Sequence, residues 1–122
     1  MKNIIAVLGF CATALFMVSC GGDSGLSLTV NSPTDGQVYA PGDVVSITGV
    51  ANDDLGVTSI QFIIESIGVN ESLSGMANQT VEFTYDVPLD INRPLEDDVE
   101  IKIISSDEDG NSEEVKRKIN IR

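Results

Sequence analysis

Apolar and polar residues alternate along most of this chain, and turns interrupt the alternation at short intervals. Leu26, Leu28 and Val30 are separated by polar residues, as are Ile60 and Phe62. A period of two residues is typical of strands that are buried on one face. The same pattern occurs in 44–52, 81–87, 99–104 and 115–121, and more briefly in 38–40.

Residues rich in Pro, Gly, Asp and Asn separate these runs and predict turns. They are 33–36, 41–42, 53–56, 88–94 and 105–112. Residues 68–78 are polar and predict at most a short strand near 71–73. About seven strands with no helical period between residues 26 and 122 predict an all-β fold, an antiparallel β-sandwich with Greek-key connections.

The first twenty residues have a different pattern. A cationic start, Met1-Lys2, precedes an apolar run from Ile4 to Met17, as in a secretory signal. The sixteen residues from Ile4 to Ser19 are fewer than the roughly 20 that a membrane-spanning helix needs. Met17-Val18-Ser19-Cys20 resembles the lipobox of bacterial lipoproteins. That resemblance implies cleavage before Cys20 and acylation of Cys20, which includes palmitate.

The expected organisation therefore has three parts. Residues 1–19 form a helical signal peptide that is cleaved, 20–25 form a lipidated cysteine with a flexible tether, and 26–122 form the sandwich domain. Gly21 stands where an Asp would resemble an inner-membrane retention signal, so the outer membrane is expected. The periplasmic and the exterior face of that membrane both stay open.

Charge and residue usage exclude several kinds of function. After cleavage six basic residues face nineteen acidic ones, a formal side-chain charge of −13 (6 minus 19). Such a surface disfavours nucleic acid, which needs clustered Lys and Arg. The chain has no His, and its two cysteines are Cys11 in the signal and Cys20. With no histidine base, free thiol or phosphate-binding loop, we expect no enzyme and no firmly indicated cofactor.

Several of the turns resemble those of bacterial immunoglobulin-like domains. The resemblance is carried by Ser32-Pro33-Thr34-Asp35-Gly36, by Ala51-Asn52-Asp53-Asp54-Leu55-Gly56-Val57 and by Ser106-Asp107-Glu108-Asp109-Gly110-Asn111. It covers roughly residues 26–122 and implies an Ig-like sandwich. Domains of this kind occur as spacers, stalks and accessory modules of secreted and surface proteins.

The acidic turns are the one candidate site. In a sandwich of seven strands the turn at 53–56 and the last hairpin turn lie at the same pole, which would bring Asp53 and Asp54 near Asp107 and Asp109. Carboxylates gathered there suit Ca²⁺, which needs about six to eight oxygen ligands. The competing interpretation is that these residues only form turns. Residues 96–98, also acidic, are expected at the opposite pole as a solvated edge.

The sequence leaves the partner open between classes. The main hypothesis is a lipid-anchored envelope protein whose Ig-like domain binds another envelope or surface protein, or acts as a spacer. The alternative is a calcium-stabilised adhesion or glycan-binding module. Glycan sites use exposed aromatic rings, and Tyr39 is the one candidate, because Phe62, Phe83 and Tyr85 lie on predicted core faces.

Overall fold

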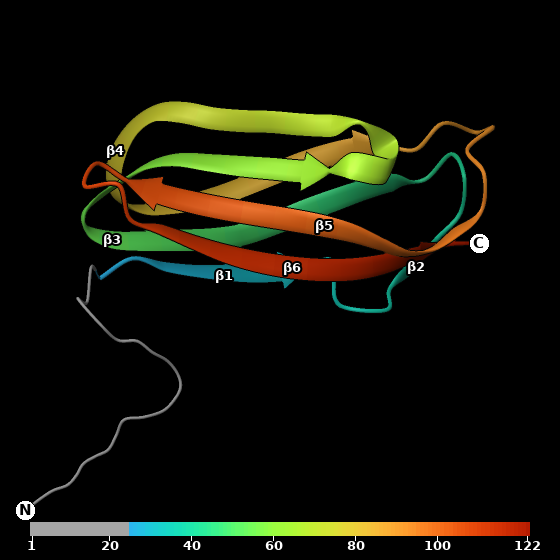
Figure 1. Ribbon diagram of the computed structural model, residues 1–122, viewed down its shortest axis with the longest axis horizontal. Coiled ribbons are helices and arrows are strands. Elements are labelled where there is room, and N and C mark those ends of the chain that lie inside the picture. Colours follow the sequence, from blue (N-terminus) through green and yellow to red (C-terminus); the bar gives the residue numbers. More distant parts are fainter. Residues whose placement is uncertain (1–24) are drawn as a thin grey trace, which may run out of the picture.

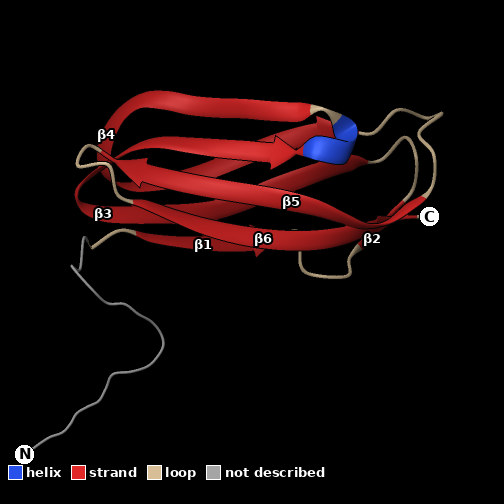
Figure 2. Ribbon diagram, in the orientation of Figure 1, coloured by secondary structure: helices blue, strands red, loops and turns tan. Residues whose placement is uncertain are grey.

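The computed structural model describes residues 25–122, and the predicted signal peptide and Cys20 lie outside the described residues. Six β-strands and one short 3₁₀ helix make up this part of the chain (Figures 1 and 2). In chain order they are β1 (Ser27–Ser32), β2 (Val38–Tyr39), β3 (Val44–Ile64), η1 (Glu65–Ile67), β4 (Val69–Pro88), β5 (Glu96–Asp107) and β6 (Ser112–Ile121). The prediction of an all-β sandwich is confirmed.

Two long strands, β3 and β4, each contribute to both layers of the sandwich. The first half of β3 pairs antiparallel with β1 and with the second half of β4. Its second half pairs with β5 and with the first half of β4, and β5 pairs onward with β6. Figure 1 shows β3 and β4 running out along the long axis, bending, and returning.

The structure corrects one prediction at the bend of β3. The turn predicted at 53–56 does not end a strand, because β3 continues from Val44 to Ile64. The ladder with β4 is instead irregular between Asn52 and Val57. Gly56 permits the bend, since its φ is 120° and a Cβ there would lie 3.0 Å from the carbonyl oxygen of Ala77. Glycine alone reaches such a φ without strain and leaves room for this approach.

A second correction concerns residues 68–78. From Val69 onward they form the first half of β4 and not a loop with a short strand, although nearly all of them are exposed. This half of β4 pairs with β3 along one side, and its side chains meet solvent on both faces. Because neither face is buried, the sequence carries no alternation there.

The core lies between the two layers and is built from the predicted inward residues. Phe62 is fully buried at its centre, with the ring of Tyr85 stacked 4.8 Å away and that of Phe83 tilted at 5.6 Å between ring centroids. The other large, fully buried side chains are Pro33, in the loop after β1, and ten aliphatic residues: Val45, Ile47, Val57, Ile60, Ile64, Val99, Ile101, Ile103, Ile119 and Ile121. All ten aliphatic residues come from strands β3, β5 and β6.

Strand register places the loops at two opposite poles. Ser27 pairs with Asn52, and Val57 pairs with both Asn78 and Asp107, so the start of β1 shares one end with the β5–β6 turn. We call this end the entry pole, because the described chain enters the sandwich there. At the other end, Val44 pairs with Pro88, and Ile121 pairs with Tyr39 and Glu96. We call that end the far pole; η1 and the loops 40–43 and 89–95 lie there (Figure 1).

Candidate functional site

The four predicted site residues all lie at the entry pole, but they point in different directions. Asp53 and Asp107 are buried, with only 2% and 5% of their surfaces exposed. Asp54 and Asp109 are exposed, and the carboxylate of Asp54 lies beside Gly25. The structure therefore buries two of the four and exposes the other two. No group of three or more His, Cys, Asp or Glu side chains suited to a metal ion occurs within residues 25–122.

Asp107 organises the turn between β5 and β6. Its Oδ1 accepts hydrogen bonds from the backbone N–H groups of Asp109 at 3.0 Å and Asn111 at 2.9 Å, and its Oδ2 accepts one from Asn111 Nδ2 at 3.0 Å. Burial acts to raise the pKa of Asp107, but these hydrogen bonds from Asn111 and Asp109 outweigh it. The pKa of Asp107 is thus lowered, which favours the ionised form.

Asp53 has a matching role in the bend of β3. Its Oδ2 accepts hydrogen bonds from the N–H groups of Leu55 and Gly56, both at 2.9 Å. Aspartate favours such bends because its short side chain reaches the backbone two and three residues on. Its second oxygen, Oδ1, is buried and accepts no hydrogen bond. Turn formation therefore accounts for three of the four oxygens of Asp53 and Asp107.

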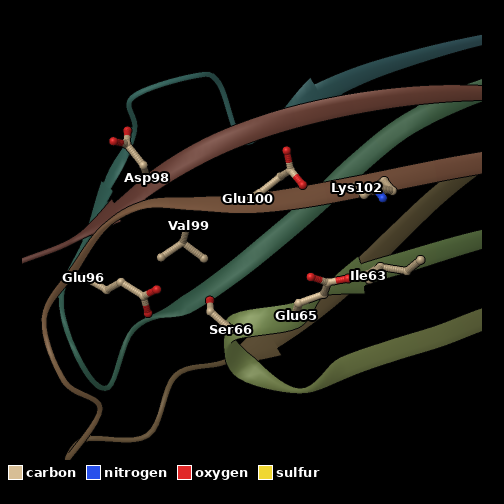
Figure 3. Close-up of a pocket in the computed structure, with 8 residues that line it drawn as sticks. All are labelled: Ile63, Glu65, Ser66, Glu96, Asp98, Val99, Glu100 and Lys102. Atoms are coloured by element: carbon tan, nitrogen blue, oxygen red, sulfur yellow. The ribbon is translucent and has the colours of Figure 1, made fainter.

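The predicted acidic edge at residues 96–98 lies at the far pole, as expected, and borders a pocket of about 170 Å³. The pocket is lined by Ile63, Glu65, Ser66, Glu96, Asp98, Val99, Glu100 and Lys102 (Figure 3). In Figure 3 Glu96 points toward Ser66, whereas Asp98 points away. Arg93 bridges Glu96 Oε1 at 3.0 Å and the carbonyl oxygen of Ser66 at 2.7 Å. Arg93 therefore already pairs the charge of Glu96, one of the charged residues that line this pocket.

The prediction of an exposed ring at Tyr39 is wrong. Tyr39 is only 8% exposed, because β2 pairs with the end of β6 and turns the ring into the core. Desolvation raises the pKa of its hydroxyl, which is hydrogen-bonded to the side chain of Ser32. Phe62 and Phe83 are buried as predicted, and Tyr85 is half-buried. Among residues 25–122 no aromatic side chain is exposed as a platform for a sugar ring.

Sequence reasoning missed a set of exposed aliphatic side chains at the far pole. Ile91 and Leu95 are 73% and 68% exposed on the loop between β4 and β5, and Val38 and Val44 are exposed nearby. The loop is held in place, because Leu89 is buried and its N–H donates a hydrogen bond to the carbonyl oxygen of Asp43 at 2.8 Å. The two prolines that bound 88–94 predicted a loop, but nothing in its sequence separates buried Leu89 from its exposed neighbours.

Within residues 25–122 the structure contains no helix long and apolar enough to span a membrane.

Solved structures resemble this domain at low sequence identity. Fibronectin(III)-like modules of CbhA from Clostridium thermocellum match with a TM-score of 0.57 and 16% identity, over 78% of this chain and 94% of theirs. The BIgI domain of beta protein from S. agalactiae, solved bound to CEACAM1, gives 0.46 and 21% over 80% and 96% of the two chains. Spo0M, a sporulation control protein from Bacillus subtilis, gives 0.44 and 12% over 80% of this chain and 48% of its own.

The likeness to the CbhA modules, at a TM-score of 0.57, shows the fold alone. No curated protein matches the chain in sequence. A family model described as bacterial Ig domain does match, over residues 27–93. The match begins with β1, ends in the loop after β4 and spans more than half of the 122 residues. Domains of the Ig and fibronectin(III) type are generally not catalytic, and this chain belongs to the bacterial Ig domain family.

Proposed function

We propose that this chain is a lipid-anchored protein of the bacterial outer membrane, whose Ig-like domain acts by protein contact or as a spacer and not by catalysis. The anchor part rests on sequence: the apolar run to Met17, the lipobox-like Met17-Val18-Ser19-Cys20 and the Gly21 that follows. Multiple acyl chains hold a protein stably at a bilayer, whereas a single chain gives only marginal binding.

The placement of the two poles is the observation that carries the proposal. Gly25, the first residue that the structure describes, lies at the entry pole beside Asp54. An anchor at Cys20 would therefore hold that pole close to the membrane. The far pole, with its exposed aliphatic side chains, would face away from the membrane and toward other envelope proteins. A domain on a short flexible tether can present such a surface without a second domain.

Exposed aliphatic side chains on a fixed loop support protein contact. Apolar groups that are already held in place lose little entropy on binding, and buried aliphatic or aromatic side chains dominate most interfaces. Arg93 holds the far-pole loop through Ser66 and Glu96, and Asp90 Oδ1 accepts the N–H of Asn92 at 2.7 Å. The aliphatic side chains of Ile91 and Leu95 are thus displayed by a backbone with its own internal hydrogen bonds.

The anchor is tested by replacing each cysteine in turn in a bacterial host. Cys20→Ser should abolish incorporation of labelled palmitate and release the protein from the detergent phase. Cys11→Ser is the matched control, because it also removes a thiol from the predicted leader but should leave lipidation intact. Palmitate incorporation that persists in Cys20→Ser would overturn the anchor proposal. Density-gradient separation of the two membranes then tests outer-membrane delivery, and protease added to intact cells tests which face is occupied.

Contact through the far pole is tested with a photo-crosslinking amino acid. Placed at position 91 in the membrane-bound protein, it should form a discrete adduct with an envelope protein. Placed at position 55, where Leu55 is equally aliphatic and exposed but lies at the entry pole, it should not. Adducts of equal intensity at both positions would count against a specific far-pole contact, and the absence of any adduct would leave the spacer role.

A further inference from the structure

The first half of β4, residues 69–78, has an open sheet edge. It pairs with the second half of β3 along one side, and no further strand within residues 25–122 pairs with β4. In Figure 1 this half of β4 lies along the outer rim of the sandwich. A strand that is paired on one side only turns alternate N–H and C=O groups outward on the other side. Another extended chain can add to the sheet there.

The other strand edges of the described domain are protected. At β1 the guanidinium of Arg117 donates a hydrogen bond to the carbonyl oxygen of Val30 at 3.1 Å. Strand β2 offers only two residues, and the second half of β4 carries the exposed carboxylates of Glu82 and Asp86. Charged side chains and short strands are common means by which proteins keep an edge from pairing with another chain.

The first half of β4 has little of this protection. Residues 72–81 contain no charged residue and no proline, although the chain has nineteen Asp and Glu residues. Glu71 is the one charged residue between positions 69 and 78. An edge with so little charge in so acidic a domain accepts a second chain without placing like charges opposite each other.

The register with β3 gives this edge two different faces. Leu73 pairs with Ile60, which is fully buried, so its side chain projects on the core side of the sheet. It is nevertheless 37% exposed, because it lies at the rim of the core. Ser72 pairs with Gln61 and projects on the opposite face. A strand added here would therefore meet an apolar rim on one face and polar side chains on the other.

We propose that the outer edge of residues 69–76 binds an extended, positively charged segment of another protein, which adds to the sheet as a strand beside β4. Apolar side chains on one face of that segment would cover Leu73 and Val69. Lys or Arg side chains on its other face would be attracted to the acidic domain. A second copy of this chain fits less well, because it brings the same formal charge of −12. This surface is distinct from the far pole and independent of the anchor at Cys20.

The experiment measures binding of a capped synthetic peptide of about ten residues in which Val and Lys alternate. Residues 21–122 serve as the protein, because they contain every described strand and the whole core cluster. Hydrogen exchange of the backbone N–H groups is followed by NMR with and without the peptide. Alternate N–H groups between positions 69 and 76 should exchange rapidly in the free domain. Their exchange should slow at least about tenfold when the peptide is saturating.

Two control peptides separate strand addition from attraction by charge. A peptide with the same side chains, but with every backbone nitrogen methylated, keeps the charge and lacks the N–H donors. It should bind at least about tenfold more weakly. A peptide of alternating Val and Glu keeps the N–H donors and should be repelled by the acidic domain. Equal binding of the methylated and unmethylated Lys peptides would overturn the proposal, because no strand would then be added.

A matched pair of variants tests the position of the site. Leu73→Lys places a charge at the rim of the open edge and should weaken binding of the Lys peptide at least about tenfold. Leu55→Lys places the same charge on an exposed leucine at the entry pole and should change binding by less than about twofold. Equal weakening in both variants would overturn the site. Urea unfolding checks that both variants fold, and the methylated peptide decides the question if Leu73→Lys does not.

Sedimentation of the free domain tests the choice of partner. The domain should remain a monomer over the concentrations used for peptide binding. A dimer that protects the N–H groups of residues 69–76 without any peptide would show that a second copy occupies the edge. That result would overturn the assignment of the edge to a positively charged partner.

Discussion

The two poles of the sandwich place similar residues in opposite environments. At the entry pole, two aspartates are buried and hold backbone N–H groups, and the backbone bends tightly beneath them. At the far pole, acidic side chains such as Asp90 and Asp97 are exposed, and so are aliphatic side chains such as Ile91 and Leu95. Two acidic side chains are therefore buried at the entry pole, whereas Asp90 and Asp97 at the far pole lie on a solvated surface.

This contrast has a cause in the strands. The entry pole contains the bend where β3 changes layers, and the chain must satisfy backbone groups that the ladder leaves unpaired between Asn52 and Val57. The far pole contains loops that leave the sandwich and return, and water can reach most of their backbone. Substitutions at the bend of the entry pole should consequently cost more stability than substitutions of the exposed side chains at the far pole, which should mainly affect contacts with other molecules.

Two glycines with positive φ give the sharpest test of this difference. Gly56→Ala at the entry pole should lower the free energy of unfolding by about 2–4 kcal/mol, because its φ of 120° suits glycine alone and the new Cβ would press on the Ala77 backbone. Gly68→Ala at the far pole should cost only about 1 kcal/mol. Its φ of 80° lies near the left-handed region, and nothing lies within 4 Å of the new Cβ.

Urea unfolding of both variants measures the two costs. Equal losses of unfolding free energy would mean that backbone strain alone causes both losses. The close packing of β3 on β4 at the bend would then contribute nothing to the cost of Gly56→Ala.

Acid should weaken the entry pole through Asp107. Burial acts to raise the pKa of this carboxyl, but hydrogen bonds from Asn111 and Asp109 lower it below its ordinary value. The unfolded chain therefore takes up a proton at a higher pH than the folded chain does. The stability that Asp107 contributes is fully present above about pH 4 and is lost as the pH falls through that value toward the lower folded pKa.

Urea midpoints at pH 6 and pH 3, measured in EDTA, should therefore fall less in Asp107→Asn than in the unchanged sequence. Asp90→Asn is the control at the far pole, where the Asp90 carboxylate accepts a hydrogen bond from one backbone N–H group. If the two variants show the same loss between these pH values, the hydrogen bonds to Asp107 do not stabilise its ionised form.

Sequence alone predicted the strands that have one buried face, and it predicted which loops share a pole. Alternation located β1, β5 and β6 to within a few residues, and the positions of Phe62 and Ile101 in the core followed from it. It could not locate the first half of β4, whose two faces are both exposed. Composition likewise gave no reason to treat the bend of β3 as part of a strand, since Asp, Asn and Gly are also the residues of true turns.

The expected sandwich topology correctly placed the four candidate aspartates at one pole, but the sequence did not predict the directions of their side chains. Neighbouring residues of a strand point to opposite faces, so Asp53 turns inward and Asp54 outward. In the β5–β6 turn the strand ends at Asp107, and strand alternation no longer decides the direction of Asp109. Burial of Tyr39 was missed for a related reason: two residues of β2 are too few to show a period, and the pairing with β6 settles which side chain points inward.

The smallest expected effect on stability comes from the far-pole aliphatic side chains. The double substitution of Ile91→Ser and Leu95→Ser should change the free energy of unfolding by less than about 0.5 kcal/mol, because both side chains are mostly exposed in the folded domain. Leu55→Ser at the entry pole is the matched control and should be equally neutral in urea. The poles should differ only in contact with other proteins. With a photo-crosslinking amino acid at position 38, which is also at the far pole, the double variant should lose the adduct to the envelope protein. The Leu55→Ser variant should keep that adduct. A large loss of stability in the double variant would mean that the loop 89–95 is held by these side chains and not by Leu89 and Arg93. The far pole would then be structural in the same sense as the entry pole.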